Sequence, residues 1–284
     1  MPDSLVKDLI DAGIHFGQRR SSWNPKMGPY IFGERNKIHI IDIRQTIKGL
    51  LLAKRFLQNT VSSGKDVCFV GTKRQARACV EKYAMDVSMP YVIERWLGGT
   101  LTNFRTIRER LKRLEELEHL VDSGEIDTYS KKMTSQLLRE KRKITRNLQG
   151  IRNMNKLPGA LVVVDVRREV NALREARSLG IPTICLIDTD GDPDMVDIPI
   201  PGNDDSMRSI EVVIRELCDA VTRGKAGQAA ADRAAGTDES QPTSQRRRSS
   251  RSQFRADDAT EAGGDPAADA VVAPVAAPAQ PARD

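Results

Sequence analysis

Short apolar runs alternate with amphipathic segments along residues 1–223. The runs of strand length are "KIHIIDI" (37–43), "VCFVGT" (67–72), "YVIERW" (91–96), "ALVVVD" (160–165) and "TICLID" (183–188), followed by the shorter "DIPIP" (197–201). Between them, apolar residues recur at helical spacing, as in residues 45–61 and 206–221. Continuous apolar strands joined by helices are typical of a parallel sheet buried between two helical layers. The pattern therefore predicts an α/β domain made of residues 1–101 and 156–223.

Residues 102–155 interrupt this alternation, because they contain no run typical of a strand. Apolar residues follow a three-four spacing from Phe104 to Val121 and again from Met133 to Ile151, with the turn-like "DSGEIDTYS" between them. This spacing predicts two long helices folded back on each other as an antiparallel coiled-coil hairpin inserted into the α/β domain.

The composition changes after residue 223. Residues 224–284 consist mostly of Ala, Pro, Gly, Ser, Asp and Gln, and offer few large apolar groups to offset the entropy of an ordered chain. We expect a disordered, low-complexity tail over 224–284. The "RRRSSRS" within it suits either an electrostatic contact with nucleic acid or a charged linker.

The net charge of +6 hides an uneven distribution along the chain. Residues 1–94 carry +6 and residues 95–156 carry +7, whereas residues 157–223 carry −6 and residues 224–284 carry −1. A split of this kind points to a polyanionic partner for the first part of the molecule, although a solvated basic surface is the plain alternative.

Neither a membrane nor an oxidising compartment is indicated by the sequence. It contains no run of about 18 apolar residues, and the acidic start "MPDSLVKDLIDAG" is unlike a signal peptide. Cys68, Cys79, Cys185 and Cys218 lie in apolar runs without metal-like spacing, so we expect reduced core cysteines. These features favour a cytoplasmic protein without a membrane partner.

The stretch "RRSSWNPKMGPYIFGERN" (19–36) concentrates cations and aromatic rings on a segment that its prolines and glycines keep irregular. Cations neutralise phosphates and aromatic faces stack on unpaired bases, so the segment is a candidate RNA contact. The alternative is that its rings cover the sheet edge, and we expect both, with the rings partly packed inward and the cations outward. The candidate RNA-binding residues of this stretch are Arg19, Arg20, Trp23, Asn24, Lys26 and Arg35.

Further candidates follow the predicted strands and lie on the hairpin. "VGTKRQAR" presents Lys73 and Arg74 at a helix start, where backbone N–H groups favour a phosphate. It lacks the glycines of a nucleotide-binding loop, so we expect no nucleotide cofactor. "RWLGGTLTNF" places Arg95 and Asn103 beside two glycines, either as a ligand-contacting loop or as a simple strand-to-helix turn. On the hairpin the candidates are Arg105, Lys141 and Arg142, together with the other cations of its outer faces, among them Arg139, Lys143 and Arg146.

Acidic residues supply the case for an enzyme. Asp165 ends one strand, and "IDTDGDPDMVD" places Asp188 and several further aspartates after another, where carboxylates could hold a cation for phosphoryl transfer. The same residues are ordinary helix caps and turn formers. Because the sequence shows no nucleophile paired with a base, we expect no catalytic residue and no small-molecule substrate. A metal-dependent α/β phosphotransferase remains the rival class, and a free RNA-binding regulator is a third interpretation.

Six motifs together resemble the bacterial small-subunit ribosomal protein S-two family (universal uS-two). They are "LIDAGIHFG", "WNPKMGPYIFGERNKIHIIDI", "VGTKRQA", "RWLGGTLTNF", "LPGALVVVDVRRE" and "IPIPGNDDSMRSI", and they run in order from about Leu5 to Val221. The resemblance implies a flavodoxin-like three-layer α/β/α domain with a protruding coiled-coil hairpin. It implies a structural, non-enzymatic place in the small ribosomal subunit, contacts with small-subunit ribosomal RNA and neighbouring proteins, and recruitment of ribosomal protein S-one.

One position departs from the family pattern. The family often has H-F-G-H where this chain has "HFGQ", with Gln18 at the last position. If some members hold a metal there, this chain has one ligand fewer, and His15, Asp188 and Asp205 are only weak metal candidates. We therefore expect no cofactor and no tight metal site.

Overall fold

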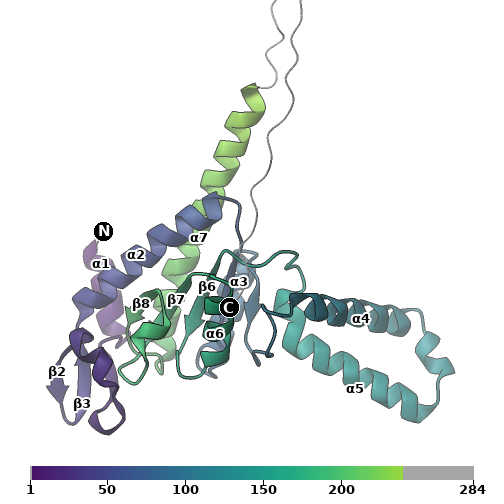
Figure 1. Cartoon of the computed structure of the whole chain (residues 1–284), viewed down its shortest axis with the longest axis horizontal. Coiled ribbons are helices and arrows are strands. Elements are labelled where there is room, and N and C mark those ends of the chain that lie inside the picture. The colour runs from purple at the N-terminus through teal and green to yellow at the C-terminus, as the bar shows by residue number, and fades with distance from the viewer. Residues whose placement is uncertain (1, 239–284) are drawn as a thin grey trace, which may run out of the picture. The chain divides into compact units, whose positions relative to one another are not determined.

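The structure, a computed structural model, describes residues 2–238 (Figure 1). The predicted tail over 239–284 lies outside the described residues. Among the described helices, none combines the length and the apolar character needed to cross a lipid bilayer.

A five-stranded parallel sheet forms the centre of the α/β domain. Its strands are β4 (Val67–Val70), β5 (Tyr91–Val92), β6 (Ala160–Val164), β7 (Thr183–Ile187) and β8 (Ile198–Pro201). They lie in the order β5-β4-β6-β7-β8, and every neighbouring pair is parallel. Counted along the sheet's own strands, this order is 2-1-3-4-5, the flavodoxin-like order. The predicted α/β class with a parallel sheet is confirmed.

Alternate residues of the strands enter two separate cores, one on each face of the sheet. Val67, Phe69 and Val162 pack with α2 (Ile43–Ser62), α3 (Arg77–Asp86) and α7 (Met207–Asp238). On the other face, Cys68 and Leu161 pack with α6 (Val170–Ser178) and with the base of the inserted helices. Because both faces are covered, the strands are apolar at consecutive positions rather than alternating.

The first predicted strand belongs to a different sheet. Residues 37–43 were expected among the strands of the parallel sheet, but β3 (Ile38–Ile41) instead lies between β1 (Phe16–Arg19) and β2 (Ile31–Arg35) in an antiparallel sheet. Asn36 and Lys37 have φ angles of 54° and 61°, as a two-residue hairpin turn of type I′ requires. This turn pairs β3 with β2 before the chain enters α2.

The segment before that hairpin is more regular than expected. It contains β1, the short 3₁₀ helices η1 (Arg20–Ser22) and η2 (Pro25–Tyr30), and β2. The helix α1 (Pro2–Asp11) precedes it.

Two helices, α4 (Phe104–Asp122) and α5 (Lys131–Leu148), occupy the predicted insertion and lie side by side (Figure 1). The short helix η3 (Glu125–Thr128) joins them, and Leu117, Ile126 and Leu137 form a small core between them. At their base, Ile107, Leu111 and Leu148 join the core beneath the parallel sheet. After α5, η4 (Gln149–Ile151) leads back towards β6.

The helix α7 corrects the predicted start of the tail. Residues 224–238 are helical, although disorder was expected from residue 224. At Gly224, a Cβ atom would lie 2.9 Å from Val61 Cβ and 3.0 Å from Gln58 O, so α7 passes very close to α2 here. Lys225 Nζ also donates to Val87 O at 2.6 Å. These contacts, together with the high helix propensity of alanine, continue α7 past the predicted boundary.

The 3₁₀ turn η5 (Pro193–Met195) lies between β7 and β8.

Candidate nucleic-acid interface

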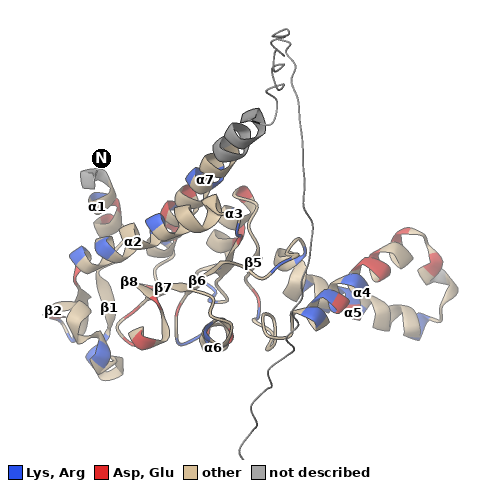
Figure 2. Ribbon diagram, turned by 45° about the horizontal axis from the view of Figure 1, so that its top comes forward, with Lys and Arg blue, Asp and Glu red and all other residues tan. Residues whose placement is uncertain are grey.

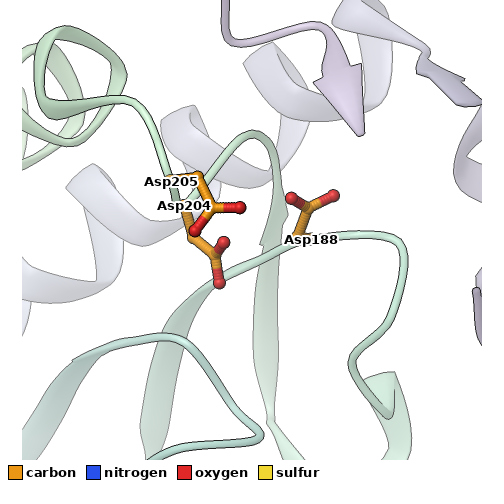
Figure 3. Close-up of side chains that lie close together, drawn as sticks. All are labelled: Asp188, Asp204 and Asp205. Carbon is orange, nitrogen blue, oxygen red and sulfur yellow. The ribbon is translucent and has the colours of Figure 1, made fainter. Parts of the chain in front are cut away.

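A cluster of carboxylates lies at the carboxyl ends of the parallel strands. Asp188 follows β7, while Asp204 and Asp205 lie between β8 and α7, and one oxygen of each falls within 4.8 Å of the others (Figure 3). Lys73, which follows β4, donates from Nζ to Asp204 Oδ1 and Asp205 Oδ1, each at 2.7 Å. Its Nζ also lies 3.4 Å from Asp165 Oδ2. The ammonium group therefore holds three carboxylates together.

The electrostatics of the cluster follow from burial and from the crowding of like charges. Burial and the neighbouring Asp165 raise the pKa of Asp204 to about 8, although Lys73 acts in the opposite direction. Burial also raises the pKa of Asp188 to about 6. Burial of the Lys73 ammonium opposes its charge, but the adjacent carboxylates, led by Asp204, raise the pKa of Lys73 well above its ordinary value. Lys73 is thus a fixed internal cation.

Gln18 also contacts the cluster, as a donor to two of its three carboxylates. Its Nε2 donates to Asp188 Oδ2 at 3.1 Å and to Asp205 Oδ2 at 2.6 Å. The amide of Gln18 and the ammonium of Lys73 together therefore satisfy oxygens of all three carboxylates. His15 does not join the group: its Nδ1 has no hydrogen-bond partner in the described structure, and its ring lies 4.2 Å from that of Phe16.

Lys73, one of the residues predicted to contact RNA, has its side chain directed into the protein. The side chain is 11% exposed and is directed towards aspartates from β6 and from the loop before α7. The ammonium is held by these carboxylates in the folded chain. Its neighbour Arg74 is exposed, as predicted for a contact residue.

A cleft of about 920 Å³ lies between α5 and the carboxyl edge of the sheet, and we call it the hairpin cleft. In Figure 2, Lys and Arg gather on the part of the hairpin helices nearer the sheet, whereas Asp and Glu also lie towards their far end. The cations that line the cleft are Arg77, Arg95, Arg139, Arg142, Lys143, Arg146 and Arg168. Glu94 and Glu169 are the two acids among its lining residues.

The loop after β6 fixes one side of the hairpin cleft. Asp165 adopts a left-handed φ of 71°, and its Oδ1 accepts from Arg167 N at 2.9 Å and from Arg168 N at 3.2 Å. Arg168 Nε donates to Thr72 Oγ1 at 3.2 Å. Thr72 in turn donates from its backbone and its hydroxyl to Glu169 Oε1. The side chain of Arg168 is therefore held at the end of β4.

Glu94 links two guanidinium groups at the cleft. Its Oε2 accepts from Arg146 Nη2 at 2.7 Å and lies 3.1 Å from Arg77 Nη1. The hydrogen bond from Arg146 holds the pKa of Glu94 below its usual value. Because Arg146 belongs to α5 and Arg77 to α3, this carboxylate connects the hairpin to the α/β domain.

A second carboxylate organises the loop that leads into α4. Glu175 of α6 accepts from Trp96 Nε1 at 3.0 Å, from Gly99 N at 2.8 Å and from Leu101 N at 2.9 Å. Burial acts in the opposite direction, but these bonds hold the pKa of Glu175 below its usual value. The loop "LGGT" therefore wraps around a carboxylate, and its glycines serve this turn.

The N-terminal candidates lie on and beside the antiparallel sheet. Arg19 and Arg20 line a hollow of about 540 Å³ with Ser21, Glu34 and Lys37. Arg20 Nη1 lies 3.6 Å from Glu34 Oε2. The half-buried Trp23 ring lies 5.1 Å from the ring of His39, so it covers the sheet as the alternative interpretation proposed. Arg35 is exposed at the end of β2.

Several other predicted contact residues are engaged locally. Lys26 Nζ pairs with Asp192 at 3.0 Å and with Asp194 at 2.6 Å. Asn24 Oδ1 accepts from Lys26 N and caps η2. Asn103 Oδ1 accepts from Thr106 Oγ1, and Arg105 Nε lies 3.4 Å from Glu109 Oε1. Lys141 is half-buried on α5 and does not line the hairpin cleft.

The structure therefore brings only some of the predicted residues together. Arg95 and Arg142 line the hairpin cleft together with Arg139, Lys143 and Arg146 from the outer face of the hairpin. Spacings of three and four place these last three residues on one helix face, so the sequence pattern indicated them. Arg77 and Arg168 gave no such signal, since their positions depend on contacts across the sheet.

Comparisons with known proteins agree with this architecture. The family model described as Ribosomal protein S2 matches residues 9–224. The "Small ribosomal subunit protein uS2" of Rhodopirellula baltica is 59% identical over 225 residues, which cover 79% of this chain and 86% of that protein. The protein of the same name from Syntrophobacter fumaroxidans is 48% identical over 220 residues, covering 78% of this chain and 80% of its own.

Proposed function

The chain belongs to the ribosomal protein S2 family, and we propose that it binds small-subunit ribosomal RNA through its basic and aromatic surfaces. The family has a structural role in the small ribosomal subunit and is not a family of enzymes. In bacteria this subunit lies in the cytoplasm.

The observation that carries the proposal is a set of exposed cations outside ion pairs. Within residues 2–238, Arg19, Arg35, Arg74 and Arg95 are exposed and form no salt bridge. They lie in the part of the chain that carries +13, residues 1–156. Cations paired inside the protein would indicate that the charge stabilises the fold. Unpaired cations on the surface can instead contact the phosphates of a nucleic-acid backbone.

A protein partner is proposed on the antiparallel sheet. Phe16, Phe32 and Ile38 are 50%, 78% and 37% exposed, so each of its three strands presents a large apolar side chain to solvent. We assign this surface to a neighbouring protein of the small subunit, ribosomal protein S-one.

The α4–α5 hairpin is proposed to pack as a short coiled coil. Residues 1–101 and 156–223 are proposed to form the α/β domain that carries it.

Salt dependence of RNA binding tests the RNA proposal. The full chain is titrated with purified small-subunit ribosomal RNA at increasing salt. Each phosphate contact is expected to contribute a slope of about −0.7 in log affinity against log salt for single-stranded regions. Replacing two unpaired cations, Arg19→Gln with Arg35→Gln, should therefore reduce the slope by about 1.4.

The matched control removes two exposed cations from α2, Lys48→Gln with Arg55→Gln, which were not predicted as contacts. This control should leave the slope unchanged. A flat salt response of the unsubstituted chain would contradict the electrostatic proposal.

A further inference from the structure

We propose that the hairpin cleft is a phosphate-binding site that receives a sharp turn of an RNA backbone, with several phosphates entering it together. The inference rests on the proposed RNA-binding function and assigns it a specific site. It is carried by the charges that line the cleft, by the two walls that present them, and by the character of the cleft floor.

The charge of the hairpin cleft is unbalanced in favour of cations. Seven Lys and Arg side chains line it against two Glu side chains. Of the acids, Glu94 is paired with Arg77 and Arg146, and Glu169 accepts from Thr72. Among the described residues, Arg95, Arg139, Arg142, Lys143 and Arg168 form no salt bridge. A concave surface with this excess of one sign concentrates the field and attracts a polyanion.

The unpaired cations come from two facing walls. Arg139, Arg142 and Lys143 lie on α5, whereas Arg95 and Arg168 lie on loops that follow β5 and β6. Arg168 is held by Thr72, and Arg146 is held by Glu94, so part of the site is already arranged before a ligand enters. One guanidinium group can donate two parallel hydrogen bonds to a phosphate, and a phosphate between the two walls can be contacted from both sides.

The volume and the floor of the cleft favour a backbone rather than a base. At about 920 Å³, the cleft lies near the top of the range of roughly 300–1,000 Å³ found for ligand pockets, so it has room for more than one phosphate. Its aromatic lining residue, Trp96, is only 6% exposed, and its Nε1 donates to Glu175. With no free ring on which a base could stack, recognition falls on the phosphates and on the shape of the turn.

The test compares two triple variants of the full chain that lose the same charge from the same hairpin. The cleft variant carries Arg139→Gln, Arg142→Gln and Lys143→Gln. The control variant carries Lys112→Gln, Lys131→Gln and Lys132→Gln, which are exposed but do not line the cleft. Affinity for purified small-subunit ribosomal RNA is measured against salt. Thermal unfolding shows whether both variants keep the fold, as expected for exposed positions.

The cleft variant should bind at least about tenfold more weakly, and its salt slope should be smaller by about 2, as expected for three lost contacts. The control variant should stay within about threefold of the unsubstituted chain. Equal losses in both variants would overturn the cleft assignment and leave general RNA binding intact. No binding by the unsubstituted chain would overturn both proposals.

Chemical protection supplies an independent measurement. Phenylglyoxal modification, read by peptide mass spectrometry, should slow at Arg139, Arg142 and Arg168 when the RNA is bound, and should not change at Arg55 on α2. If the cleft arginines react equally fast with and without RNA, while the complex remains formed, the cleft does not hold the backbone.

Discussion

At the scale of single residues, Lys73 and Asp204 show how a cation can be used inside the protein. The ammonium joins aspartates that follow different strands, and Gln18 satisfies two oxygens on the other side of the cluster. Breaking such a buried pair by removing one partner typically costs about 3–5 kcal/mol, because an uncompensated charge is left behind. These residues hold the carboxyl edge of the sheet together, and the chemistry of a phosphotransferase is not needed to explain them.

The raised pKa of Asp204 predicts a pH dependence of stability. In the unfolded chain the carboxyl returns to a pKa near 3.8, whereas in the folded protein it is about 8. Between these values the folded state binds more protons than the unfolded state, so the free energy of unfolding falls as the pH rises. Lys73 stays charged throughout this range because its pKa is raised.

In the unsubstituted chain, Asp204 should make the free energy of unfolding fall by up to about 1.4 kcal/mol per pH unit between pH 6.5 and pH 8. Asp204→Asn should remove this fall. Urea unfolding at several pH values measures it. The control is Asp192→Asn, because Lys26 lowers the pKa of Asp192 and places its titration well below this range. An equal slope in both variants would show that Asp204 does not titrate there.

At the scale of elements, Glu175 connects α6 to the loop that opens the hairpin. Glu175→Ala would leave the backbone N–H groups of Gly99 and Leu101 and the indole N–H of Trp96 without their acceptor. Each unsatisfied buried donor costs about 1–3 kcal/mol, and partial access of water reduces the sum, so we expect a loss of about 2–4 kcal/mol. Denaturant unfolding measures the loss, and hydrogen exchange should accelerate at Gly99 and Leu101.

A surface carboxylate provides the comparison. Glu118 pairs with Arg152 at 2.7 Å, and both side chains are partly exposed. Glu118→Ala should cost less than about 1 kcal/mol. If Glu175→Ala were no more damaging than Glu118→Ala, the loop would not depend on the carboxylate of α6.

Helices and strands were predictable where the pattern of apolar residues that indicates them lies within one segment of the chain. The apolar runs of β4, β6 and β7 and the three-four spacing of α4 and α5 are local, and the structure has these elements where the pattern placed them. The sheet to which residues 37–43 belong was not predictable from the run itself, because the choice depends on the turn at Asn36 and Lys37. The continuation of α7 past residue 223 is supported by its contact with α2 at Gly224. Amino-acid composition alone does not predict such a contact.

Site residues were less predictable for the same reason. Lys73 was placed correctly after a strand, but the aspartates that bind it lie about 90 to 130 residues further along the chain. The hairpin cleft likewise joins α5 to loops after three strands. Charge distribution along the sequence indicated the kind of partner, whereas the location of the cleft required the folded arrangement.

At the scale of the whole molecule, the basic hairpin and N-terminal segment are carried by an α/β domain whose own acidic residues are largely used internally. Asp165 and Asp204 bind Lys73, while Asp192 and Asp194 bind Lys26. Acidic residues of 157–223 therefore contact cations of the same chain, whereas Arg19, Arg35, Arg74 and Arg95 form no salt bridge within residues 2–238. The family resemblance read from the six motifs is confirmed by the comparisons.

Sedimentation of a cell lysate through a sucrose gradient tests most directly whether the chain is a constituent of the small ribosomal subunit. The fractions are probed for this protein at high magnesium, where subunits associate, and at low magnesium, where they separate. We predict that the protein moves with the small subunit at low magnesium, in a one-to-one ratio with its RNA, and with whole ribosomes at high magnesium. Recovery at the top of the gradient under both conditions would contradict the assignment.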